Sequence, residues 1–119
     1  MDLGKSLEDY LEAILVLKKK TGNVRSIDVA RYMEFSKPSV SHAVKELRTR
    51  GYLEMNQDGS LVLTETGNKI AERVYERHCF LKSFFIKIGV SSELAEKDAC
   101  QIEHIISEET FQILKKNYS

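Results

Sequence analysis

Three side chains near the C-terminal end of the chain could bind a transition metal together. Within the stretch DACQIEHIIS, Cys100, Glu103 and His104 offer a thiol, a carboxylate and an imidazole. On a helix, where each residue turns by about 100°, the three would fall within an arc of about 100°. Divalent metals of the first transition row bind these ligand types, so the spacing predicts a metal site.

Other potential ligands lie elsewhere in the chain. Asp9 and Glu12 are one turn apart in an expected first helix, where both carboxylates could reach one ion. His78 lies on the apolar stripe of a long helix and is expected to point inward. A metal near these groups is favoured because clustered acids would repel one another without a cation.

Each of these residues also has a simpler interpretation. Asp9 could close a capping box with Ser6, and Glu12 could be a solvated charge. His78 could be a core histidine with satisfied hydrogen bonds, and Cys100 could act as a small hydrophobic residue. Taken one at a time, these alternatives are preferred for Asp9, Glu12 and His78, whereas for the Cys100-Glu103-His104 cluster neither interpretation is preferred. Taken together, the residues favour a metal.

The elements that would position these residues follow from hydrophobic periodicity. Helices are expected over about 6–19, 26–33 and 36–50, and Asp58-Gly59 lies between two short apolar runs that predict a β-hairpin. A long helix should start at Thr64 with a break or kink near 79–81, followed by two shorter helices. We expect a mainly α fold: a winged helix-turn-helix of three helices and a hairpin wing over residues 1–64, and a helical metal-binding and dimerisation domain over 65–119.

The third helix has an apolar and a polar face, as expected of a helix that enters the major groove of DNA. Short donors and a cation on its polar face could contact base edges, while basic residues around it and the hairpin tip could contact phosphates. A merely solvated face is less favoured, because caps, charge, wing and periodicity agree. The residues expected to contact DNA are Arg25, Ser36, Lys37, Pro38, Ser39, Ser41, His42, Lys45, Arg48, Arg50 and Gln57.

Charge is distributed unevenly along the chain. Basic and acidic residues number 18 each, but residues 18–50 hold nine basic against three acidic side chains. This local excess favours contact with DNA. No apolar run approaches a membrane span, and the first residues lack the layout of a signal peptide. We therefore expect a cytoplasmic protein with no membrane partner, whose cysteines are free thiols or ligands.

The second half has more large apolar residues than a domain of this size needs for its own core, which predicts a homodimer. The residues expected at the dimer interface are Phe80, Leu81, Phe84, Phe85, Ile88, Phe111 and Leu114.

Over nearly its whole length the sequence resembles the metal-dependent repressors of the diphtheria toxin repressor and manganese transport regulator family. The matching stretches are EDYLEAI, SKPSVSHAVKELRTRGYL, GSLVLTETG, RHCFLKSFF and DACQIEHIISEE. The resemblance implies a homodimeric, metal-activated repressor of metal-uptake genes that binds a palindromic operator. It also implies that Asp9, Glu12, His78, Glu103 and His104 are metal ligands.

Two positions depart from the family pattern. Manganese-sensing members have glutamate at the position of Cys100; iron-responsive members have cysteine there but methionine at the position of Asp9. Lys82 stands where the iron-type ancillary site would require a carboxylate. A thiolate softens a site whose carboxylates are hard ligands, so we expect manganese(II) or iron(II), with cobalt or zinc able to substitute. The number of ions per chain, one or two, is left open.

The expected mechanism couples metal and DNA. Asp9 and Glu12 belong to the DNA-binding half and the other ligands to the second half, so a metal held by both would fix the angle between them. A metal-independent winged-helix regulator that senses a small molecule is an alternative. A small zinc hydrolase, with His78, Cys100 and His104 as ligands and Glu103 as base, is less favoured. The preferred interpretation involves no enzyme activity and no small organic ligand.

Overall fold

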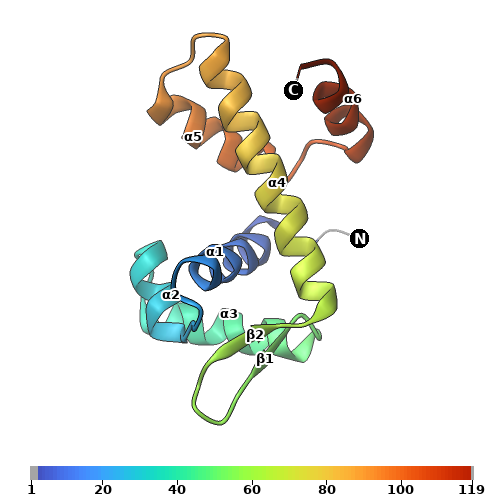
Figure 1. The fold of residues 1–119 in the computed structure, drawn as a ribbon. Coiled ribbons are helices and arrows are strands. Elements are labelled where there is room, and N and C mark those ends of the chain that lie inside the picture. The colour runs from blue at the N-terminus through green and yellow to red at the C-terminus, as the bar shows by residue number, and fades with distance from the viewer. Residues whose placement is uncertain (1–2, 119) are drawn as a thin grey trace. The chain divides into compact units, whose positions relative to one another are not determined.

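The computed structural model describes residues 3–118 (Figure 1). These residues form two compact units, unit 1 up to residue 72 and unit 2 from residue 73, which are described one at a time. The elements in chain order are α1 (Lys5–Thr21), α2 (Ser26–Met33), α3 (Lys37–Thr49), β1 (Leu53–Met55), β2 (Leu61–Leu63), α4 (Glu65–Lys87), α5 (Ser92–Ile102) and α6 (Glu108–Tyr118). Among the described residues, no helix combines the length and apolar character that crossing a membrane requires.

Unit 1 is a three-helix bundle with a β-hairpin. Helix α1 contacts α2, α3 and β2, and α2 packs on α3. Its core includes Leu11 and Ile14 of α1, Val40 and Leu47 of α3, and Leu53 of β1, all fully or almost fully buried. The apolar stripes of the sequence therefore meet in one core, and the predicted order of three helices and a hairpin is confirmed.

The hairpin lies at the position predicted from the Asp58-Gly59 pair. β1 and β2 are antiparallel, with Leu53 opposite Leu63. At the tip, Asp58 Oδ1 accepts hydrogen bonds from the backbone N–H and the hydroxyl of Ser60 at 3.0 and 2.7 Å. These bonds lower the pKa of Asp58. Because the carboxylate organises the turn, the tip has a defined shape.

The start of α1 differs from the expectation of a capping box. The N-cap is Gly4 and no side chain caps the helix, so Ser6 lies inside its first turn. The Asp9 carboxylate instead accepts a hydrogen bond from Lys5 Nζ at 2.8 Å. The capping-box interpretation of Asp9 is therefore wrong, and its half-buried carboxylate forms an ion pair with Lys5 one turn earlier.

Unit 2 consists of the second part of α4 with α5 and α6. Helix α4 runs without interruption to Lys87, so the break expected near 79–81 is wrong, whereas the alternative of a kink there stays a prediction. The core holds Val74 and Leu81 of α4, the small residues Ala95 and Ala99 of α5, and Phe111 of α6. Because Leu81 packs inward from the middle of α4, the apolar stripe continues through the region where a break was expected.

The division between the units lies inside α4, whereas the sequence placed the domain boundary at its start. The Thr64 hydroxyl donates to the carbonyl of Gly51 at 2.8 Å and accepts from the N–H of Gly67 at 3.1 Å. A Cβ atom at Gly67 would lie 1.9 Å from the carbonyl oxygen of Tyr52. The first turns of α4 thus pack against the chain that leads into the wing, which makes them part of unit 1.

Candidate metal centre and DNA-binding surface

The centre of the candidate metal site is a contact between α4 and α5. His78 projects from α4, and Glu103 is the C-cap residue of α5. Nδ1 of His78 lies 2.8 Å from Oε1 of Glu103. The Glu103 side chain is buried, and that of His78 is 17% exposed. A nitrogen and an oxygen ligand atom from different helices are therefore held together at the edge of the core.

The Cys100-Glu103-His104 cluster is only partly helical. Cys100 is half-buried in α5, but the helix ends at Ile102. The backbone N–H groups of Ile105 and Ile106 both donate to the carbonyl of Ile102, so His104 lies in a tight turn. Glu103 keeps helical dihedral angles, which preserves the spacing from Cys100 to Glu103. The expected helix is therefore shorter than predicted: of the three residues only Cys100 lies within α5, Glu103 is its C-cap, and His104 lies in the turn that follows.

A buried arginine holds this turn in place. The guanidinium of Arg77 donates to the carbonyls of Glu103 and Ile106 at 3.3 and 2.7 Å, and to Glu108 Oε1 at 2.8 Å. Hydrogen bonds from Arg77 and Gln112 lower the pKa of Glu108. Because Arg77 precedes His78 in α4, adjacent residues fix the turn and contact Glu103.

Glu96 of α5 was missed by the sequence reasoning. Its carboxylate lies 3.1 Å from Nε2 of His78 and accepts from Lys82 Nζ at 3.0 Å. Burial opposes the ionisation of Glu96, but the hydrogen bonds from Lys82 and His78 outweigh it and lower its pKa. The spacing Glu96, Cys100, Glu103 is i, i+4, i+7, which places all three on one side of α5 and could have revealed Glu96.

The remaining predicted ligands lie in unit 1. Asp9 and Glu12 are half-buried, one turn apart on α1. The imidazole, thiol and carboxylate groups of His78, Cys100 and Glu103 suit a divalent ion of the first transition row on their donor chemistry.

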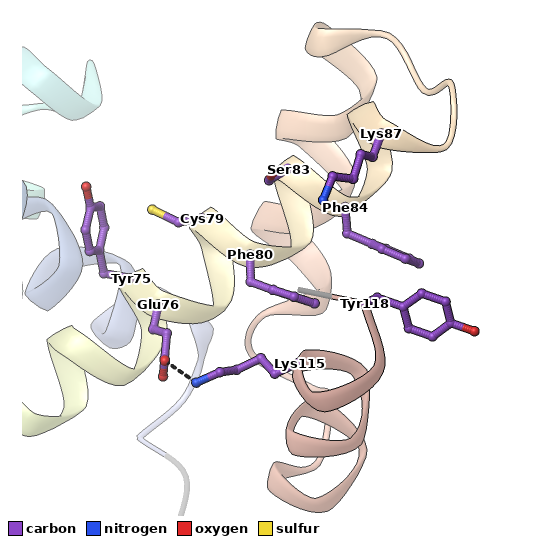
Figure 2. Close-up of a pocket in the computed structure, with 9 residues that line it drawn as sticks. All are labelled: Tyr75, Glu76, Cys79, Phe80, Ser83, Phe84, Lys87, Lys115 and Tyr118. Carbon is purple, nitrogen blue, oxygen red and sulfur yellow. Dashed lines mark hydrogen bonds and ion pairs between the residues drawn. The ribbon is translucent and has the colours of Figure 1, made fainter.

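Residues predicted at the dimer interface fall into two groups. Leu81 and Phe111 are 2% and 1% exposed inside unit 2, so they are corrected to core residues. Phe80, Phe84, Phe85 and Leu114 are half-buried, and Ile88 is 64% exposed. Phe80 and Phe84 line a groove of about 480 Å³. Figure 2 shows both rings extending from α4 toward α6, from which Tyr118 and Lys115 project; Lys115 forms an ion pair with Glu76 of α4.

Helix α3 presents the expected polar face. Ser36 is its N-cap and accepts from the N–H of Ser39 at 3.3 Å, with Pro38 in the first turn. Ser41, His42 and Lys45 are exposed, whereas Val40, Ala43, Val44 and Leu47 are buried. Since Ser36 Oγ also donates to Ser39 Oγ, at 2.9 Å, these two hydroxyls serve the helix start as well as the surface.

Basic side chains lie at both ends of the polar face of α3. Lys45, Arg48 and Thr49 line a groove of about 560 Å³ together with β1. Lys37 and Ser41 line a smaller hollow of about 240 Å³ with the start of α2.

Toward the wing, Arg25 is exposed and lies 3.9 Å from Asp58, and Gln57 is exposed at the tip. Arg50 Nε donates to Glu46 at 2.6 Å, so it is held along α3. The residues expected to contact DNA therefore share one unit and are mostly on its surface.

In comparison with known proteins, both halves of the chain match domains of the same family. Residues 2–61 match the iron-dependent repressor N-terminal DNA-binding domain, and residues 64–118 match the iron-dependent repressor metal-binding and dimerisation domain. The transcriptional regulator MntR of Escherichia coli O6:H1 is 37% identical over 109 residues, covering 92% of this chain and 70% of that protein. The regulator MntR of Shouchella clausii is 41% identical over 102 residues, or 86% and 71% of the two chains.

A solved structure agrees with these matches. The manganese regulator SloR superposes with a TM-score of 0.84 at 26% identity, covering all of this chain (100%) and 56% of that chain. This chain therefore spans about half the length of that solved structure. The predicted fold, a winged helix-turn-helix followed by a helical domain, is confirmed by this likeness and by the element order.

Proposed function

Because the chain belongs to the iron-dependent repressor family, we propose that it is a metal-activated repressor that binds operator DNA as a homodimer. The family resemblance predicted from the sequence motifs is confirmed by these matches. The named relatives are transcriptional regulators, and catalysis forms no part of the proposal. A repressor acts where the chromosome lies, which for bacterial relatives is the cytoplasm.

One observation carries the metal part of the proposal. His78 and Glu103 approach to 2.8 Å from different helices, inside the segment that matches a metal-binding domain. Cys100 is one helical turn before Glu103, and His104 follows it directly. We assign His78, Cys100, Glu103 and His104 as the ligands from unit 2. Bound metal would supply a divalent positive charge that ties these groups together.

We further assign Asp9 and Glu12 as the ligands from unit 1. The assignment follows the family resemblance, and the half-buried positions of both carboxylates one turn apart on α1 support it. A metal shared by both units would restrict their relative orientation. Metal binding and DNA binding would then be coupled through α1.

The proposed ion is manganese(II) or iron(II). Relatives named for manganese support manganese, whereas the Cys100 thiolate favours softer ions such as iron(II), cobalt(II) or zinc(II). The proposed target is a palindromic operator beside metal-uptake genes, because a two-fold symmetric dimer presents two copies of α3. The dimer would bury Phe84, Phe85 and Ile88, which are half-buried or exposed in the single chain.

The test of the metal site is anaerobic equilibrium dialysis against manganese(II), iron(II) and zinc(II), with bound metal counted per chain. The wild type and His42→Ala, altered on the DNA-binding face, should bind the same amount. His104→Ala should lose metal, because a ligand is removed. Unchanged binding by His104→Ala would contradict the proposed site.

The test of repression is selection of DNA fragments by the purified protein with metal and with chelator. Metal should enrich a palindromic sequence, and chelator should abolish the enrichment. Lys45→Ala should weaken binding with metal present, since it removes an exposed cation of α3. Equal binding with and without metal would favour the metal-independent regulator.

A further inference from the structure

The contact between His78 and Glu103 continues outward to two residues without an assigned role. Nε2 of His78 lies 3.2 Å from Oε1 and 3.1 Å from Oε2 of Glu96. Lys82 Nζ, one helical turn after His78 on α4, lies 3.0 Å from Glu96 Oε1. One ring nitrogen of His78 therefore faces Glu103, and the other faces the Glu96 carboxylate, which also forms an ion pair with the ammonium group of Lys82.

We infer that Glu96 is a positioning residue for the metal site, which accepts the Nε2–H hydrogen bond of His78 and so leaves Nδ1 as the nitrogen that binds metal. This inference rests on the proposed function. A histidine ligand binds metal through one ring nitrogen, and an acceptor at the other nitrogen fixes both the tautomer and the orientation of the ring. Here the ring is held between α4 and α5 by that acceptor.

The positions of the charges argue that Glu96 positions His78 and does not itself bind the ion. Nδ1, not Nε2, faces the buried carboxylate of Glu103. Glu96 faces the opposite edge of the ring, and one of its oxygens is engaged by Lys82. A metal ligated by Glu96 would sit close to that ammonium and be repelled by it.

The Lys82–Glu96 pair adds little stability by itself. Glu96 is 49% exposed and Lys82 is 37% exposed, and ion pairs this accessible to water are weak. Its effect is directional: the ammonium restricts the carboxylate to the side of α5 where it meets the ring. Removing Glu96 should therefore affect the ligand more than the fold.

The experiment uses the full chain with three substitutions. Glu96→Ala removes the acceptor. Glu96→Gln keeps an oxygen that can accept from Nε2–H but removes the charge. Glu93→Ala is the matched control, because Glu93 is an exposed glutamate one turn earlier in the same helix. Unfolding temperatures confirm that each variant folds.

Two quantities are measured. Competition with a chelator gives the zinc(II) and manganese(II) dissociation constants. Nitrogen-15 spectra of the histidine rings in the zinc-loaded protein, which is diamagnetic, show which nitrogen of His78 carries hydrogen and how fast that hydrogen exchanges with water. The wild type should show a slowly exchanging hydrogen on Nε2 and metal on Nδ1.

We expect Glu96→Ala to weaken metal binding by about 10-fold, the usual loss when the partner of a histidine ligand is removed. Its Nε2 hydrogen should exchange too fast to detect. Glu96→Gln should restore most of the affinity and the slow exchange, and Glu93→Ala should match the wild type. Affinity and exchange unchanged in Glu96→Ala would overturn the inference, as would metal on Nε2. A wild type that binds no metal would instead overturn the proposed function.

Discussion

At the scale of single residues, the proposed metal site should owe its preference among metals mainly to Cys100. The other proposed ligands offer carboxylate oxygens and imidazole nitrogens, which suit manganese(II). The Cys100 thiolate is the one soft donor among the six. It lies half-buried in α5, one turn before Glu103.

Cys100→Glu should therefore shift the preference of the site toward manganese(II), because a hard oxygen replaces a soft sulfur. The ratio of the manganese(II) to the zinc(II) dissociation constant should fall by about 10-fold. This corresponds to a change of about 1.4 kcal/mol in relative binding free energy. Competition against a metal-sensitive dye under anaerobic conditions measures both constants. Cys79→Ser, at an exposed cysteine of α4, is the control and should leave the ratio unchanged.

A second residue-scale effect concerns Glu108. Hydrogen bonds from Arg77 and Gln112 lower its pKa in the folded chain. Folding therefore favours the ionised form, and the stabilisation is present above the glutamate pKa of the unfolded chain, about 4.3. It is lost as the pH falls through the lower folded value.

The free energy of unfolding of Glu108→Gln should thus be lower than that of the wild type at about pH 7 and converge with it near pH 3. The difference should be small, because the carboxylate is mostly exposed. Urea unfolding at several pH values measures it, with Glu109→Gln in the same helical turn as control. A difference that grows toward acid pH would show that the ion pair to Arg77 is not its origin.

At the scale of elements, the turn after α5 depends on Arg77. Arg77→Met should destabilise the chain by about 2 kcal/mol, because carbonyls that the guanidinium satisfies would lose a buried donor. Lys87→Met, at an exposed cation near the end of the same helix, should change stability by less than about 0.5 kcal/mol. Denaturant unfolding followed by circular dichroism compares them. Equal stabilities of the two variants would argue that water replaces the guanidinium.

The start of α4 offers a test in which two effects oppose each other. Alanine favours a helix over glycine by about 1 kcal/mol. At Gly67, however, a Cβ atom would lie 1.9 Å from the carbonyl oxygen of Tyr52. We expect the clash to win, so that Gly67→Ala destabilises the chain by about 2 kcal/mol. Lys69→Ala in the same helix should be nearly neutral. If thermal unfolding instead showed that Gly67→Ala stabilises the chain, the backbone at Tyr52 would have to move away from the new Cβ atom.

The sequence predicted the elements well where local patterns determine them. Apolar periodicity located α3 and its buried face, and Asp58-Gly59 located the wing. The predictions failed where distant contacts decide. The turn at His104 depends on Arg77, which lies 26 or more residues earlier, and the Glu96–His78 contact joins two helices. Local periodicity does not reveal which distant residue Arg77 or Glu96 contacts, although the i, i+4, i+7 spacing on α5 places Glu96 on the same side as Cys100 and Glu103.

At the scale of the whole molecule, the proposed ligands come from both units, whereas the groups expected to contact DNA lie in unit 1. Helix α4 is the element shared by the two units. A metal that ties α1 to unit 2 would reduce the number of relative orientations available to the DNA-binding units. This would raise the affinity for an operator whose half-sites have a fixed spacing.

Thermodynamic linkage then requires the reverse effect: operator DNA must tighten metal binding by the same factor by which metal tightens DNA binding. We expect a factor of about 10 to 100, within the range of allosteric coupling energies. Chelator competition with and without the selected operator measures it, and a scrambled duplex of equal length controls for nonspecific charge. Glu12→Gln should reduce the factor, because the substitution weakens the connection from α1 while the ligands of unit 2 remain. A metal affinity that is identical with operator and with scrambled duplex would show that metal and DNA bind independently.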